Sequence, residues 1–128
     1  MLDARKELGA KGESLAARFL KRRGYKIIQR NYRCKLGEID IIAEQDKTVV
    51  FVEVRTKQTE RFGAPQYSIT AAKRNQISKV ALSYIREKRL MGQGCRFDVI
   101  AVIFSPESRR PRIEHIENAF ELSRRYTY

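Results

Sequence analysis

The sequence has few of the residues on which disulfide scaffolds and histidine-based sites depend. It contains two cysteines, Cys34 and Cys95, one histidine, His115, and no tryptophan. Two cysteines in a chain of 128 residues do not make a disulfide framework, so we expect reduced thiols. A single histidine excludes zinc sites built from several histidines and argues against a histidine-dependent nucleophile. We interpret His115 as an edge-strand residue rather than a catalytic one.

Long apolar segments are also missing. The longest uninterrupted apolar run, from Val99 to Phe104, is far too short to span a bilayer, and the first residues carry no apolar signal-peptide core. We therefore expect a cytoplasmic protein with no membrane partner. No repeat or low-complexity tract interrupts the chain, whose length suits a single domain over residues 1–128.

Acidic residues are scarce relative to basic ones. Lys and Arg number 27 against 15 Asp and Glu, which gives a net charge of +12 and a pI near 10.1. Such an excess is typical of proteins that bind the phosphate backbone of nucleic acids. An anionic membrane surface and an acidic protein partner are the alternatives. The membrane is disfavoured, because no segment combines a basic face with exposed bulky apolar residues.

Several of the acidic residues lie in one stretch, GEIDIIAEQDKTVVFVEVRT, which runs from Gly37 to Thr56. Residues 38–43 alternate, because Glu38, Asp40 and Ile42 would share one face and Ile39, Ile41 and Ala43 the other. Residues 48–55 are rich in β-branched and aromatic types. Residues 45–47 carry a turn signal between them. This stretch therefore predicts a β-hairpin.

A two-residue loop at positions 46 and 47 would fix the pairing of this hairpin. Asp40 would then lie opposite Glu53, and Glu38 would lie opposite Arg55, all on one face. Facing carboxylates in an antiparallel pair repel each other, so we expect a positive charge between Asp40 and Glu53. Mg²⁺ binds through one or two carboxylates together with waters and substrate phosphates, and this pair offers such a site.

Two alternatives to this arrangement remain open from the sequence. A three-residue loop or a bulge would shift the register by one residue and place Asp40 and Glu53 on opposite faces. Alternatively, Glu38 and Asp40 line a solvated face, and Arg55 forms a cross-strand ion pair with Glu38.

The rest of the chain predicts helices and strands around this hairpin. In chain order they are a helix over 4–23 ended by Gly24, a strand from Tyr25 to Tyr32, an irregular loop over 56–69, a helix from the N-cap Thr70 to about Leu90, a central strand from Arg96 to Phe104, a strand from Arg112 to Ile116 and a short helical turn over 119–123.

Some charged residues lie where either an exposed or a functional role is possible. Glu13 lies at the border of the apolar stripe of the first helix, so it is either exposed or directed along the interface with the sheet. Lys73 lies on the apolar face of the second helix and either extends to solvent or reaches the hairpin. Arg30, Arg33 and Lys35 lead into the hairpin, where they suit a phosphate or simply a solvated strand end.

Taken together, these residues resemble the small bacterial YraN-like family. The resemblance covers about Gly9 to Phe120 and implies an α/β, restriction-endonuclease-like fold with a mixed central sheet of about five strands flanked by helices. It also implies similarity to archaeal Holliday-junction resolvases. The motifs that carry it are Gly12-Glu13, Gly37-Glu38-Ile39-Asp40, Phe51-Val52-Glu53-Val54-Arg55, Phe62-Gly63, Lys73 and Arg96-Phe97-Asp98-Val99.

The resemblance also implies roles for individual residues. Asp40 and Glu53 would bind Mg²⁺ or Mn²⁺, with the Val54 carbonyl and Glu13 as further ligands. Arg55 stands where the nuclease superfamily usually has lysine, and an arginine stays protonated, so it stabilises charge only. Lys73, arriving from the neighbouring helix, would supply the ammonium group instead.

The function expected from this resemblance is metal-dependent endonuclease activity on phosphodiester bonds. It favours DNA over RNA, with branched DNA as the implied substrate, although the residues alone do not choose between the two. It also implies a homodimer. The alternatives are a catalytically inactive nucleic-acid-binding module on the same fold and a basic interaction protein with an acidic partner. The residues expected to contact nucleic acid are Arg30, Arg33, Lys35, Lys57 and Lys73.

Overall fold

The computed structural model describes residues 4–58 and 69–122. These residues form α1 (Ala4–Arg22), β1 (Lys26–Cys34), β2 (Gly37–Gln45), β3 (Thr48–Lys57), α2 (Ala71–Glu87), β4 (Cys95–Ile103) and β5 (Arg112–Phe120). Most of the predicted loop over 56–69, including the Phe62-Gly63 motif, lies outside the described residues. No helix within them is long and apolar enough to cross a membrane.

The five strands form one mixed sheet in the order β1-β2-β3-β4-β5. Neighbouring strands pair antiparallel except for β3 and β4, which are parallel and are separated in the chain by α2. The predicted α/β fold with about five strands is therefore confirmed, and the arrangement is compatible with a restriction-endonuclease-like fold. The strand predicted to be central, β4, is an interior strand, whereas β3 is the middle one.

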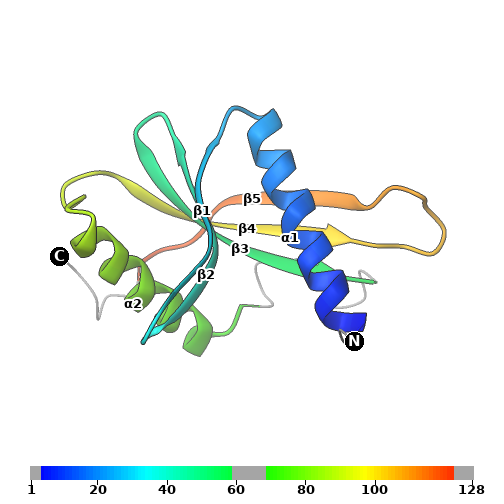
Figure 1. Cartoon of the computed structure of the whole chain (residues 1–128), viewed down its shortest axis with the longest axis horizontal. Helices are drawn as coiled ribbons and strands as arrows, with labels where there is room; N and C mark the ends of the chain where they lie inside the picture. The colour runs from blue at the N-terminus through cyan, green and yellow to red at the C-terminus, as the bar shows by residue number, and fades with distance from the viewer. Residues whose placement is uncertain (1–3, 59–68, 123–128) are drawn as a thin grey trace.

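The two helices cover opposite faces of the sheet. On one face, Ala16, Ala17 and Leu20 of α1 belong to a core cluster with alternate residues of the inner strands. On the other face, α2 contributes Ile77 and Val80, among others, to a second cluster. Apolar residues at helical spacing on each helix account for this packing. Figure 1 shows α1 crossing in front of the sheet and α2 at its opposite side.

The helix boundaries follow local sequence signals. Gly24 has φ of +88°, the left-handed conformation that commonly follows a helix C-terminus, and its amide bonds back to the Lys21 carbonyl at 3.0 Å. The Thr70 hydroxyl accepts a hydrogen bond from the Lys73 amide at 3.1 Å, which caps α2 as predicted.

One predicted boundary is wrong, because β5 extends from Arg112 to Phe120 and includes residues 119 and 120 of the predicted helical turn. Residue 123 of that turn lies outside the described residues. After a bulge, Phe120 pairs with Phe97 of β4, and their rings stack with centroids 5.0 Å apart. This burial of aromatic surface favours the longer strand over the local helical pattern.

The β2–β3 hairpin has the predicted two-residue loop. Asp46 and Lys47 both have positive φ, 46° and 68°, as a type I′ turn requires. Pairing starts at Gln45 and Thr48 and continues to Ile41 and Val52. The predicted two-residue loop and its register are therefore confirmed as far as Ile41 and Val52, and the three-residue loop is wrong, whereas the predicted pairs Asp40–Glu53 and Glu38–Arg55 lie beyond the paired ladder.

The paired ladder between β2 and β3 ends at Ile41 and Val52, beyond which the two strands diverge. In Figure 1 the end of the β1–β2 hairpin lies beside the start of α2, whereas the end of β3 lies beside the start of α1. We call the space between residues 37–40 of β2 and residues 53–57 of β3 the fork. This fork is where the predicted site residues lie.

Candidate active site

Two carboxyl groups occupy the base of the fork. Asp40 and Glu53 are the first residues beyond the paired ladder, and their side chains hydrogen-bond to each other. The second hydrogen bond of Asp40 is to the backbone, because its Oδ2 accepts from the Val54 amide at 2.8 Å. The Asp40 carboxylate thus accepts the hydrogen bond that a backbone carbonyl of a paired strand would otherwise accept from the Val54 amide. The structure brings Asp40 and Glu53 together, as the predicted register requires.

Burial makes this pair hold a proton tightly. Burial, followed by the negative charge of Asp40, raises the pKa of Glu53 to about 8. Burial also raises the pKa of Asp40, although hydrogen bonds from Val54 and Glu53 act in the opposite direction. The protonated Glu53 therefore donates to the ionised Asp40. One proton is thus shared by the two carboxyl groups, at the place where a bound cation would relieve the same repulsion between them.

Glu13 approaches the fork from α1. A Cβ atom at Gly12 would collide with the Thr56 side chain, so glycine at this position lets α1 lie close against β3. Glu13, the next residue, is partly buried, and burial followed by the charge of Asp40 raises its pKa. Its carboxylate thus lies within electrostatic reach of Asp40, which favours the interface position over the fully exposed one.

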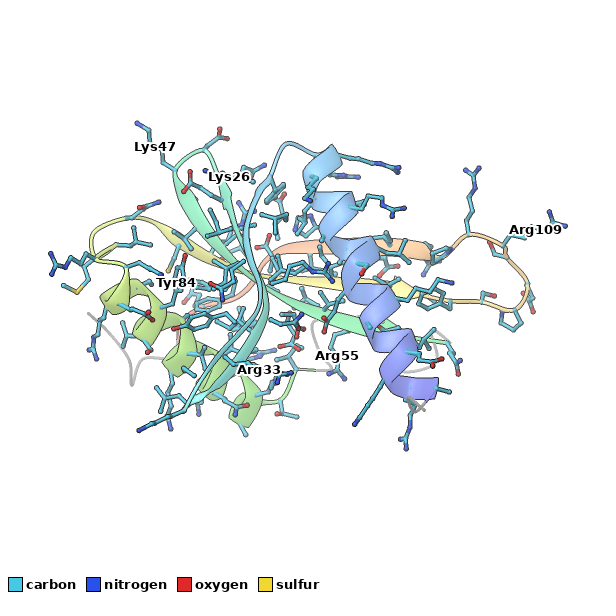
Figure 2. All side chains as sticks on the ribbon, viewed as in Figure 1. Lys26, Arg33, Lys47, Arg55, Tyr84 and Arg109 are labelled. Carbon is cyan, nitrogen blue, oxygen red and sulfur yellow. The ribbon has the colours of Figure 1, made fainter. Side chains whose placement is uncertain are left out.

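Positive charge reaches the fork from α2 and from β3. The Lys73 charge opposes the raised pKa values of both Asp40 and Glu53, so its ammonium group lies near the pair rather than away from it. Arg55 acts on Glu53 in the same direction. In Figure 2, Arg55 is seen between the end of the β1–β2 hairpin and α1. The fork therefore combines two partly buried carboxyl groups with two basic side chains.

The other predicted contact residues are spread around this site. Arg33 forms a salt bridge to Glu38 at 2.9 Å. The ion-pair partner of Glu38 is therefore Arg33, within the β1–β2 hairpin, and not Arg55 as the alternative predicted. Arg30 donates to Ser14 of α1 at 3.2 Å. The Nζ atom of Lys57 is buried and has no hydrogen-bond partner among the described residues, so it does not face solvent.

Depressions flank the fork on both sides. One of about 740 Å³ lies between α1 and the end of β3, and Glu13 and Val54 are part of its lining. A second of about 660 Å³ lies between the β1–β2 turn and the start of α2, and its lining includes Lys35, Lys73 and Lys79. A smaller one of about 360 Å³ also includes Lys73, together with Arg33, Cys34, Gly37, Glu38 and Gln76. A basic surface thus extends from the fork along α2.

The donor set limits which metal the fork suits. Within residues 4–58 and 69–122, no three Asp, Glu, His or Cys side chains gather into a metal cage. The available ligands are the Asp40 and Glu53 carboxylates, with the Val54 carbonyl as a further candidate. Mg²⁺ commonly binds through one or two carboxylates and retains several waters, whereas zinc and calcium need more protein ligands. The residues therefore fit Mg²⁺ or Mn²⁺ better than either of those ions.

A second charged cluster, on β4 and β5, was not predicted from the sequence. Asp98 is fully buried and accepts from Arg96 Nε at 2.9 Å, from Arg96 Nη2 at 3.0 Å and from the Asn118 amide at 2.9 Å. His115 Nε2 lies 2.7 Å from its Oδ2. His115 is on an edge strand as predicted, but only 5% of its side chain is exposed. The available signal was the spacing of Arg96 and Asp98, which share one face of an apolar strand.

Replacement of Glu53 by glutamine should change the pH dependence of stability. Because the folded pKa of Glu53 is about 8 and its ordinary value is 4.5, this group stabilises the folded protein below about pH 4.5, and that contribution is lost as the pH rises towards 8. In EDTA, we expect Glu53→Gln to be more stable than the wild type at pH 8 by on the order of 2 kcal/mol, and similar at pH 5. Urea unfolding at both pH values measures this difference. An equal difference at both would contradict the shared proton.

Comparison with known proteins finds the same family over most of the chain. The profile described as "Uncharacterised protein family UPF0102" matches residues 12–102. A UPF0102 protein of Geobacter metallireducens is 52% identical over 118 residues, covering 92% of this chain and 95% of the relative. One from Pelotomaculum thermopropionicum is 48% identical over 120 residues, covering 94% of this chain and 100% of the relative. Each match therefore covers nearly the whole of this chain and nearly the whole of the relative.

Proposed function

The chain belongs to the UPF0102 family, which corresponds to the YraN-like family that its motifs resemble, and from this premise we propose that it is a metal-dependent endonuclease acting on DNA. The observation that carries the proposal is the partly buried, mutually hydrogen-bonded pair Asp40 and Glu53, on which the positive charge of Lys73 acts. Buried carboxyl groups with raised pKa values are typical of functional sites, because a fold gains no stability from repelling acids.

Each residue of the fork has a distinct part in the proposed hydrolysis. Asp40 and Glu53 would hold the cation once their shared proton is released to solvent, and the Val54 amide holds Asp40 in place. A bound Mg²⁺ or Mn²⁺ would activate water and polarise the phosphoryl oxygens. Lys73 and Arg55 place positive charge where negative charge grows in the transition state.

Lys73 and Arg55 are not equivalent in this scheme. An arginine remains protonated under all ordinary conditions, so Arg55 contributes charge and hydrogen bonds only. A lysine beside a desolvated pair is able to hold or release a proton. The Lys73 backbone is fixed by the Thr70 cap, which orients the first turn of α2 towards the fork.

The basic groove between the β1–β2 turn and α2 supports a nucleic-acid substrate. Lys35, Lys73 and Lys79 line it, and the charge of Lys73 also acts on the carboxyl pair, so a phosphodiester chain in the groove would lead towards the fork. Lysines that contact successive phosphates give affinity without sequence specificity, and that affinity falls steeply with salt. Branched DNA follows from the resemblance to resolvases rather than from any contact in the groove.

A second candidate function is nucleic-acid binding without turnover. It is favoured by one observation, namely that the described residues offer two converging carboxylates rather than a cage of three or more ligands. On this alternative, the basic groove would still hold phosphates, and the carboxyl pair would keep its single proton and hold no metal ion.

An assay with several substrates tests the proposal. Labelled four-way junction, duplex DNA, single-stranded DNA and RNA are incubated with the purified protein in Mg²⁺, Mn²⁺ or EDTA, at a series of salt concentrations. We expect cleavage of DNA with either metal and none in EDTA. Salt-sensitive retention without cleavage would support the binding module instead, and absence of retention at moderate salt would leave an acidic protein as the partner.

A further inference from the structure

Asn31 has an unusual backbone conformation inside β1. Its φ is 52°, which places it in the left-handed region that residues in a strand rarely adopt. It lies between the paired residues Arg30 and Tyr32, whose partners on β2 are Ile41 and Ile39. The position across from Asn31 in this register is therefore Asp40. Asparagine tolerates this conformation better than most residues, which suits a change of direction in β1 at the level of Asp40.

The left-handed conformation changes which face of the sheet the β1 side chains occupy. In a regular strand, consecutive side chains point to opposite faces. Here Arg30 donates to Ser14 of α1 at 3.2 Å, and the side chain of the next residue, Asn31, lies near enough to Glu13 of the same helix to favour its ionised form. Tyr32 packs into the core cluster under α2. Two consecutive side chains therefore reach α1, which requires the break at Asn31.

The same break occurs in β2 at the same level. Ile39 belongs to the core cluster on the α2 face, whereas Ile41 belongs to the cluster on the α1 face. Two residues separated by one position would share a face in a regular strand, so β2 changes face at Asp40. Because both strands turn at this level, the end of the hairpin departs from β3 and the fork opens.

We infer that Asn31 is a positioning residue of the fork. Its left-handed backbone turns the β1–β2 hairpin away from β3, and its carboxamide donates a hydrogen bond that holds the Glu13 carboxylate towards Asp40. This inference rests on the proposed function, because it assigns Glu13 to the surroundings of the metal. Partners that orient the groups around a metal typically change its affinity by about 10–100-fold when removed.

The effect of the carboxamide is separated from that of the backbone by Asn31→Gly. Glycine adopts positive φ without strain, so this variant keeps the turn and loses only the donor. We expect the affinity for Mn²⁺, measured by calorimetry in the absence of nucleic acid, to fall about 10–100-fold. The far-UV circular dichroism spectrum should remain that of the folded wild type, so that a lower affinity is not a loss of the fold.

A matched control is available on β5. Asn118 also has positive φ, 50°, and it contacts Asp98 through its backbone amide, which glycine retains. Asn118→Gly is therefore the same substitution in the same backbone conformation, away from the fork. We expect its Mn²⁺ affinity to match that of the wild type. A reduced affinity in this control would overturn the assignment to the Asn31 side chain.

A double-mutant cycle with Glu13→Gln tests whether Asn31 acts through Glu13. If it does, Asn31→Gly should weaken Mn²⁺ binding in the wild type and have little further effect in the Glu13→Gln protein. The same cycle measured by urea unfolding without metal should also be non-additive, because the hydrogen bond exists in the free protein. Additive effects in both measurements would overturn the inference.

The remaining outcomes distinguish this inference from the proposed function. If the wild type binds neither Mg²⁺ nor Mn²⁺, both fail together. If the wild type binds metal and Asn31→Gly binds it equally well, only the inference fails. If Asn31→Gly does not fold, the inference also fails, since glycine suits this conformation and the side chain would then be a stability element rather than a positioning one.

Discussion

Asp40→Asn is expected to reduce metal-dependent cleavage by at least about 10²–10³-fold, because the cation that would stabilise the transition state loses one of its two carboxylate ligands. Asparagine keeps the shape of the side chain, and its carbonyl oxygen is able to accept the Val54 hydrogen bond that Asp40 Oδ2 accepts at 2.8 Å. The substitution therefore removes the negative charge with little change to the fork. Retention of DNA in EDTA should persist or increase, because one anion beside the phosphate is gone.

The control for this prediction is Asp46→Asn in the β2–β3 turn. Asp46 is exposed and has φ of 46°, a conformation that asparagine tolerates well. It removes the same charge from the same hairpin, away from the fork, and should leave cleavage and Mn²⁺ affinity unchanged. Cleavage that survives in Asp40→Asn, with a metal dependence like that of the wild type, would contradict the role of Asp40 and with it the proposed hydrolysis.

Asp98→Ala is expected to destabilise the protein by about 3–5 kcal/mol, the usual effect of removing one partner of a buried charge pair. Asp98 has no exposed surface, and it accepts hydrogen bonds from Arg96, His115 and the Asn118 amide. Burial alone would raise the pKa of Asp98, but the bonds from His115 and Arg96 outweigh it and lower the pKa. Alanine would leave the Arg96 guanidinium, mostly buried, without its anion.

The matched control is Glu114→Ala on β5. Glu114 forms an ion pair with Arg112 at 2.8 Å, with side chains that are 38% and 53% exposed. Surface pairs of this kind contribute little, so we expect a loss below about 1 kcal/mol. Urea unfolding of both variants at pH 7 measures the difference. A loss for Asp98→Ala no larger than that for Glu114→Ala would show that the buried cluster is dispensable for folding.

The parts of the fold that follow from local chemistry were predicted from the sequence. The register of the central hairpin depends only on a two-residue turn, and Asp46 and Lys47 are enough to set it. Once that register is fixed, the proximity of Asp40 and Glu53 follows from counting residues along two strands. The helix over residues 71–87 is likewise marked at its start by Thr70.

Features that depend on contacts between distant segments were not predictable in the same way. An asparagine in a strand gives no sequence signal that its φ is positive, because asparagine is compatible with both the extended and the left-handed backbone. The partners of Asp98 come from β5, and their positions depend on a bulge in its pairing with β4. The longer β5 was missed for the same reason.

The end of the β2–β3 ladder also provides a spectroscopic consequence. The Val54 amide proton is shared with a carboxylate rather than with a backbone carbonyl, so its hydrogen-bond strength follows the charge on Asp40. Its nitrogen and proton resonances should therefore titrate with pH and with added cation, while amides deeper in the same ladder stay constant. Labelling valine alone would give signals from the seven valines of the chain, among which that of Val54 reports the ionisation of the fork in solution.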